Sequence, residues 1–145
     1  MYLDAEQASE IDLVVPRATG LSVASALKRF GQPASILACS PGGELADFVK
    51  LIYPEQGLVL SVYNNCPNQW TSGTFSLKAE AQITELIFFD PGRYEEILLS
   101  RVLAGAYLGA QSQAARMTKI ESLMQDWQGL NPRTPYTSQR NCWLD

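Results

Sequence analysis

The chain has 145 residues, of which 46% are hydrophobic, and this is the size and composition of one ordinary domain. Its 11 basic and 15 acidic residues give a formal charge of −4. The basic residues are scattered singly apart from Lys28-Arg29, so the sequence predicts no nucleic-acid partner. The absence of histidine excludes Ser-His-Asp catalysis, Cys-His catalysis and histidine-ligated metal sites within this chain.

The three cysteines, Cys39, Cys66 and Cys142, have no CxxC spacing, so we expect neither a structural metal nor a cofactor. One interpretation is three reduced thiols, of which one or two are buried. In an exported protein, two of them would form a disulfide. Cys39 with Cys66 is the candidate pair that ties the sheet, while Cys142 would tether the tail, and the sequence leaves these alternatives open.

At the amino-terminal end the chain is polar and acidic. We expect residues 1–10 to be a flexible lead-in, and they lack the basic and apolar regions of a signal peptide. No window approaches the roughly 20 apolar residues of a membrane-spanning helix. The protein is therefore expected in the cytoplasm or, if Met1 follows a removed leader, outside it. Residues 11–15, stopped by Pro16, predict a short edge strand or an extended approach to a helix.

Residues 11–92 predict a helix followed by an antiparallel β-meander of about four strands. Ser22 is the expected N-cap of a helix that runs to Phe30, and Gly31 ends it as the left-handed residue. Strand candidates, rich in β-branched and aromatic residues, are 36–39, 48–53, 58–63, 74–79 and 83–89.

Two connections between the strand candidates carry turn residues, and the first, Ser40-Pro41-Gly42-Gly43, is interpreted as a hairpin connection. Pro54-Glu55-Gln56-Gly57 predicts a tight reversal, so the strands on either side of it should pair antiparallel. Alternation along the second strand puts Leu58, Leu60 and Val62 on one face and Val59, Ser61 and Tyr63 on the other.

Residues 93–128 carry two runs of apolar residues with a helical period, the second from Ala114 to Trp127. We expect a break between them near Gly109, because glycines disfavour a helix interior. The tail, 129–145, has no period and is expected to be irregular. The prediction is one α+β domain spanning 1–145, with the amino-terminal helix and the carboxy-terminal helices packed on the meander.

Catalytic residues are not predicted. A histidine-free enzyme would use carboxylates, and the candidates are Glu44, Asp47, Glu80 and Glu85, none with a distinguishing spacing. Glu95-Glu96 are explained by the helix dipole. No thiol has a basic neighbour that would activate it.

Aromatic residues in the loops and tail offer a different kind of site. Exposed tryptophan and tyrosine anchor protein interfaces, and the candidate interface residues are Trp70, Trp127, Tyr136 and Trp143. Trp70, in a loop of Asn, Pro and Ser, is the one most expected to face a partner. The alternative is that each ring pins an irregular segment onto the sheet.

Two short motifs carry a resemblance: a helix closing on Gly31-Gln32-Pro33, and the strand reversal Tyr53-Pro54-Glu55-Gln56-Gly57 followed by Cys66-Pro67. Over about residues 21–89 the chain resembles small bacterial envelope domains, lipoprotein-like modules of the BamE/SmpA or β-lactamase-inhibitor-protein type. The resemblance implies an antiparallel sheet with helices against one face, export to the envelope and protein–protein contact without catalysis.

The expected function is therefore a non-catalytic protein-interaction domain of the cell envelope with an unidentified protein partner. The alternative is a small-molecule or lipid carrier with a pocket between sheet and helices. A carboxylate-dependent hydrolase is a third possibility. A homodimer is also possible, because the helix from Ala114 to Trp127 would pack equally well on its own sheet or on a second copy.

Overall fold

The chain has an α+β fold, seen in a computed structural model that describes residues 10–16, 20–40, 48–63, 74–75, 77–99, 112–130, 136–137 and 139–140. Within these residues there are three α-helices, one 3₁₀ helix and nine strands. In chain order they are β1 (Glu10–Val14), α1 (Val23–Phe30), β2 (Ser35–Ser40), β3 (Phe48–Tyr53), β4 (Leu58–Tyr63), β5 (Thr74–Phe75), β6 (Gln82–Phe89), the 3₁₀ helix (Pro91–Arg93), α2 (Tyr94–Ile97), α3 (Gln113–Leu123), β7 (Met124–Asp126), β8 (Tyr136–Thr137) and β9 (Gln139–Arg140).

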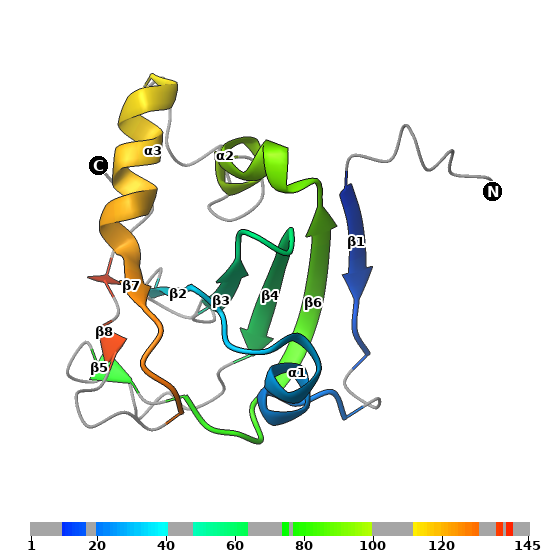
Figure 1. The fold of residues 1–145 in the computed structure, drawn as a ribbon. Coiled ribbons are helices and arrows are strands. Elements are labelled where there is room, and N and C mark those ends of the chain that lie inside the picture. The colour runs from blue at the N-terminus through cyan, green and yellow to red at the C-terminus, as the bar shows by residue number, and fades with distance from the viewer. Residues whose placement is uncertain are drawn as a thin grey trace, which may run out of the picture.

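Six strands form an open antiparallel sheet in the order β1-β6-β4-β3-β2-β7, and β9 adds parallel to β2 (Figure 1). The four central strands are a meander, but the whole sheet is not. β1 precedes α1 in the chain and joins the far edge beside β6, while β7 follows α3 and joins the opposite side beside β2. The simple meander predicted from the sequence is therefore wrong at both edges.

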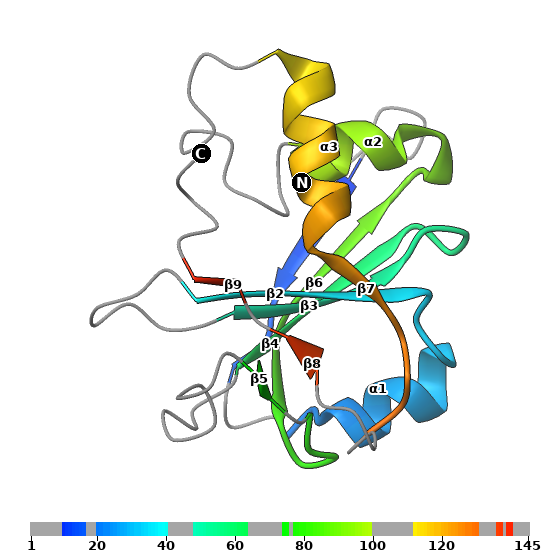
Figure 2. The same ribbon diagram turned by 90° about the vertical axis from the view of Figure 1, so that its left-hand side faces the viewer.

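The helices lie on both faces of the sheet. Figure 2 shows α1 on one side, and α2 with α3 on the other. We call these two sides the α1 face and the α2–α3 face. The arrangement differs from the single covered face that the resemblance implied, because β4 alternates apolar residues on both faces and each face needs a cover.

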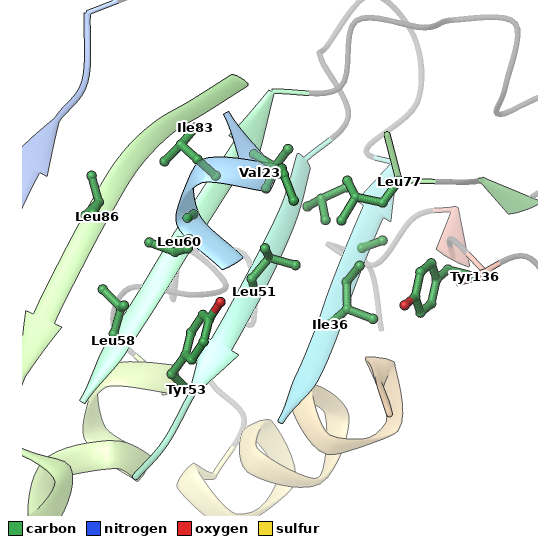
Figure 3. Close-up of a cluster of buried hydrophobic side chains, with 14 residues drawn as sticks. Val23, Ile36, Leu51, Tyr53, Leu58, Leu60, Leu77, Ile83, Leu86 and Tyr136 are labelled. Carbon is green, nitrogen blue, oxygen red and sulfur yellow. The ribbon is translucent and has the colours of Figure 1, made fainter. Parts of the chain in front are cut away.

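Two clusters of buried side chains fill the space between the layers. On the α1 face, shown in Figure 3, the cluster comprises Val23, Ala26, Ile36, Ala38, Val49, Leu51, Tyr53, Leu58, Leu60, Val62, Leu77, Ile83, Leu86 and Tyr136. On the α2–α3 face it comprises Leu37, Ile52, Val59, Ile87, Phe89, Ile97, Leu98, Leu99, Ile120 and Leu123. Burial of this much apolar surface is the main stabilising contribution.

Helix α1 follows the predicted bounds. The Ser22 side chain accepts a hydrogen bond from the Ser25 N–H at 3.1 Å, and Gly31 ends the helix at φ 84°. The last carbonyls of the helix are bound by the sheet, since the Tyr53 hydroxyl donates to Gly31 and the Gln56 side-chain amide donates to Phe30. The helix is thus satisfied at its carboxyl end by the β3–β4 hairpin.

The strand expected over 74–79 does not form. Of the residues described there, only Thr74 and Phe75 form a strand, β5, which pairs with β8 in a separate two-stranded sheet. The carbonyls of Ala79 and Ala81 instead accept the N–H groups of Ala24 and Val23 at the start of α1, both at 2.9 Å. These carbonyls satisfy helix donors that would otherwise lack a partner, so they are not available to a sheet ladder.

The helix expected over 114–127 ends early. α3 stops at Leu123, and β7 then pairs with Ser35–Leu37 of β2. Met124 still packs on the α2–α3 face, but Trp127 packs on the α1 face, so the chain crosses the sheet edge between them. A continued helix would have left the outer edge of β2 at these residues without a backbone partner.

The other predicted elements have different outcomes. The predicted edge strand before Pro16 is confirmed as β1, and the Asp90 side chain accepts the Gly92 N–H at 2.9 Å to begin the 3₁₀ helix before α2. The tail predicted as irregular contains β8 and β9. The lead-in before Glu10 and the break near Gly109 lie outside the described residues.

Gly57 is a position where a side chain would be strongly destabilising. Its φ is +66°, and an added Cβ would overlap the carbonyl oxygen of Phe89. Gly20 has the same φ with nothing within 4 Å, so it is a matched control. Both alanine variants lose about 1 kcal/mol from left-handed strain. We expect Gly57→Ala to lose roughly 2 kcal/mol more in urea unfolding, because β4 and β6 must move apart. Equal losses would contradict this account.

Tyr53 makes the stability depend on alkaline pH. Burial raises its pKa from the usual 10.0 to about 12. The folded protein therefore holds the phenol proton more tightly, and this stabilisation is complete below about pH 10 and lost as the pH rises through about 12. We expect the free energy of unfolding to fall by up to about 1.4 kcal/mol per pH unit in that window.

Urea unfolding of the protein and of Tyr53→Phe at several pH values between about 9 and 12 would measure the effect. The variant should show a shallower fall, although Tyr94 and Tyr136, whose pKa values burial also raises, still contribute. Parallel curves for the two proteins would remove Tyr53 as the cause.

Candidate functional site

β1 is the end strand of the sheet, and the described part of the chain places no strand beyond it (Figure 1). It pairs antiparallel with β6 from Glu10 opposite Phe89 to Val14 opposite Glu85. Just after the strand, the Val15 N–H donates to the Thr84 carbonyl at 2.8 Å. Pro16 follows this bond, and a proline, which has no N–H and a fixed φ, is typical of sheet edges and strand ends.

The side chains of β1 are exposed although three of them are apolar. Ile11 is 44% exposed, Leu13 48% and Val14 78%, and they are the large apolar side chains on the surface of the described residues. Of the features that commonly protect edge strands, β1 has a short length, two charged residues, Glu10 and Asp12, and the nearby Pro16, and its apolar side chains are exposed all the same. An exposed apolar edge strand is a surface that other chains can contact.

The two faces of β1 differ in character. Ile11 and Leu13 lie opposite Phe88 and Leu86, which belong to the packing on the α1 face. By alternation, the side chains of Glu10, Asp12 and Val14 project to the α2–α3 face. β1 thus continues the apolar surface of β6 on one face and is acidic on the other.

Acidic residues gather around one cation near the start of β1. Arg93 hydrogen-bonds and ion-pairs with Glu96, and this hydrogen bond is the main reason that the pKa of Glu96 is lowered and that of Arg93 raised. Attraction from Glu10 and Asp90 raises the Arg93 pKa further. This corner therefore carries three carboxylates within the electrostatic reach of one guanidinium.

A second candidate is a row of polar side chains across the sheet, Lys50 on β3, Ser61 on β4 and Glu85 on β6. They are register partners, with Lys50 opposite Ser61 and Ser61 opposite Glu85. The Lys50 ammonium donates to the Ser61 hydroxyl at 2.6 Å and lies 3.8 Å from the Glu85 carboxylate, while the Ser61 hydroxyl donates to Glu85 at 3.2 Å.

Serine beside lysine is a pair that some hydrolases use as nucleophile and base. Here the ammonium donates to the serine and the serine hydroxyl donates to Glu85, so two hydrogen bonds and one ion pair link the three side chains. Ser61 is 7% exposed. The arrangement satisfies three polar groups on a mainly apolar face, which is a structural role.

The carboxylates that were considered for a hydrolase do not share one environment. Glu85 belongs to the polar row, whereas Glu80 is an exposed turn residue. Glu44 and Asp47 lie outside the described residues. No convergent pair of catalytic carboxylates is therefore seen in the part of the chain that is described.

The structure places two of the four aromatic candidates. Tyr136 is 2% exposed and stacks on Trp127 with ring centroids 6.1 Å apart. Its hydroxyl accepts from the Gln128 N–H and donates to the Gly129 carbonyl, and the Trp127 indole donates to Gln32. Tyr136 is therefore part of the buried packing on the α1 face. Trp70 and Trp143 are not among the described residues.

The cysteine pairing stays a prediction. Cys39 is on β2, opposite Phe48 on one side and Gln139 on the other, while Cys66 and Cys142 lie outside the described residues. In the part of the chain that the structure covers, there is no cluster of three or more side chains of the metal-binding types His, Cys, Asp and Glu. The described helices include none long and apolar enough to cross a membrane.

Comparison with protein-family models, with curated protein sequences and with solved structures finds no match.

Sequence reasoning missed both candidate sites. The signal for β1 was present in residues 11–15, but its exposure depends on its place at the sheet edge. The pairing of Lys50 with Ser61 could have been predicted from the sequence, since the turn at Pro54–Gly57 fixes the register of the two strands. The position of Glu85 beside Ser61 could not, because an additional strand was expected between β4 and β6.

We expect Lys50 and Glu85 to be energetically coupled. Lys50→Met leaves the half-buried Glu85 carboxylate without its cation, whereas Lys50→Met combined with Glu85→Gln removes both charges. A double-mutant cycle should give a coupling energy of about 1 kcal/mol, since both side chains are largely shielded from water. The exposed Arg93–Glu96 pair is the control and should couple more weakly and be more salt-sensitive. Coupling no stronger than in the control would contradict a stabilising role for the row.

Proposed function

We propose that this chain is a non-catalytic protein-interaction domain and that β1 is its docking surface. The observation that carries the proposal is the exposure of Ile11, Leu13 and Val14 at 44%, 48% and 78% on the end strand of the sheet. Water contact with these side chains is unfavourable, and a partner that covers them gains that free energy.

The carrier alternative has less support. It needs a pocket between the sheet and the helices, and in the described residues these spaces hold the two packed clusters of buried side chains. The hydrolase alternative is also weaker, because Ser61 and Glu85 are engaged with Lys50.

Location belongs to the same proposal. The resemblance over residues 21–89 favours the bacterial cell envelope after removal of a leader, and the cytoplasm is the alternative. The partner is a protein, either a different chain or a second copy of this one.

Site-specific crosslinking tests the docking surface. A photoreactive amino acid at Val14 should yield a discrete adduct with a partner protein in cells of the source organism, because the side chain is 78% exposed. The same probe at Glu55, exposed in the β3–β4 turn, is the control and should yield none.

The adduct is then identified, and the purified partner is titrated against the unmodified protein and two variants. Leu13→Asp should weaken binding by about tenfold or more, because a carboxylate would be buried in an apolar contact. Gln113→Asp, on the exposed start of α3, should leave the affinity unchanged. Equal adducts at Val14 and Glu55, or unaltered binding by Leu13→Asp, would refute β1 as the docking surface.

A further inference from the structure

We propose that the side of β1 on the α1 face binds a segment of a partner protein that carries apolar side chains next to carboxylates. This inference rests on the proposed function and specifies the chemistry of the partner at the same site. A run of contacts carries it, and these contacts join exposed apolar residues of β1 to the basic end of α1.

Three contacts connect β1 to α1 across the α1 face. Ile11 of β1 lies opposite Phe88 of β6 in the register of the sheet. The Phe88 ring meets the Phe30 ring of α1 edge to face, with centroids 6.4 Å apart. The Arg29 guanidinium lies over the Phe30 ring, 5.9 Å from its centroid. The exposed side of β1 and the carboxyl end of α1 are therefore parts of one continuous surface.

The apolar part of this surface, which we call the apolar strip, comprises Ile11, Leu13, Phe30 and Phe88. Ile11 is 44% exposed and Leu13 48%, while the two phenylalanines are half-buried. Aromatic and arginine side chains are enriched at protein interfaces, where they dominate the binding free energy. Apolar residues of a partner would remove the strip from water.

The helix end beside the apolar strip is positively charged. Lys28 and Arg29 are the one adjacent basic pair in the sequence, and α1 has no acidic residue. Neither of the two side chains forms an ion pair with the described residues. By alternation, the acidic residues of β1 project to the opposite face of the sheet. Carboxylates of a partner would therefore meet unpaired cations next to the strip.

The position of Arg29 over Phe30 suits it to bind a carboxylate. A guanidinium that lies over a ring uses its flat face for that contact, and its N–H donors point outward in its own plane. These donors match the two oxygens of a carboxylate. The ring contact also restricts the arginine side chain, so less conformational entropy is lost when a partner binds.

An anionic membrane and a second copy of this chain fit the strip less well. Electrostatic membrane binding takes clusters of about 4–8 basic residues, whereas α1 presents two in a chain of formal charge −4. A symmetric dimer through the strip would bring the basic ends of two α1 helices together, and like charges in an interface repel. A partner segment with carboxylates is the occupant that complements both the apolar and the charged part.

Selection from a random library of short peptides tests the inference. The whole protein is the bait, and the selected peptides are synthesised and titrated against it by backbone amide NMR. We expect the selected peptides to combine aspartate or glutamate with large apolar residues, and to shift the amide signals of β1 and of the end of α1. Their affinity should fall as salt is added, because the charged contacts are exposed.

Two variants that each remove one positive charge separate the role of Arg29 from general attraction. Arg29→Gln removes the stacked guanidinium. Lys78→Gln removes an exposed charge in the turn before β6, at the opposite end of α1, where Ala79 accepts the Ala24 N–H. We expect Arg29→Gln to lose about tenfold in affinity for the selected peptides, with Lys78→Gln nearly unchanged. Thermal unfolding establishes that both variants are folded.

The outcomes distinguish this inference from the proposed function. If no peptide is selected, if the selected peptides lack acidic residues, or if Arg29→Gln binds them as well as Lys78→Gln does, the inference is refuted. The docking surface would still stand if Leu13→Asp weakens binding of the crosslinked partner. Binding to phosphatidylserine vesicles that Arg29→Gln abolishes would make a membrane the occupant, and a dimer that Arg29→Gln dissociates would make it a second copy. Either result would overturn the inference.

Discussion

The central hairpin, β3 with β4, has apolar side chains on both faces, and the rest of the structure depends on this constraint. Leu58, Leu60 and Val62 project to one face, while Val59 projects to the other. A sheet of this kind cannot leave either face in water, so helices must cover both. α1 arrives from the amino-terminal side, and α2 with α3 arrive from the carboxy-terminal side (Figure 2).

Covering both faces requires the chain to cross the sheet edges, and these crossings determine which edges are closed. β7 runs along β2 as the chain passes from α3 to Trp127, and it pairs with the outer edge of β2 over Ser35–Leu37. Beyond β7, the rings of Trp127 and Tyr136 stack on each other. On the opposite side of the sheet, β1 is the last strand, and its apolar residues remain on the surface.

The polar row and the apolar edge illustrate two outcomes for residues that depart from the expected pattern. Lys50, Ser61 and Glu85 are polar residues on a buried face, and their mutual hydrogen bonds satisfy them without any requirement for a ligand. Ile11 and Leu13 are apolar residues on an exposed edge, and no comparable compensation is seen for them in the described residues. The second departure is the observation on which the proposed function rests.

The sequence by itself determined the local elements: the capped helix from Ser22 to Gly31, and the β3–β4 hairpin with its register. Their signals lie within a few residues of one another, in caps, turns and alternation. Only the tertiary structure decided that the predicted strand over 74–79 instead supplies carbonyls to α1, that the predicted helix ends at Leu123, and that β1 lies at the far edge beside β6. These outcomes depend on backbone groups distant in sequence finding partners, and such competition leaves no periodic signal in the residues themselves.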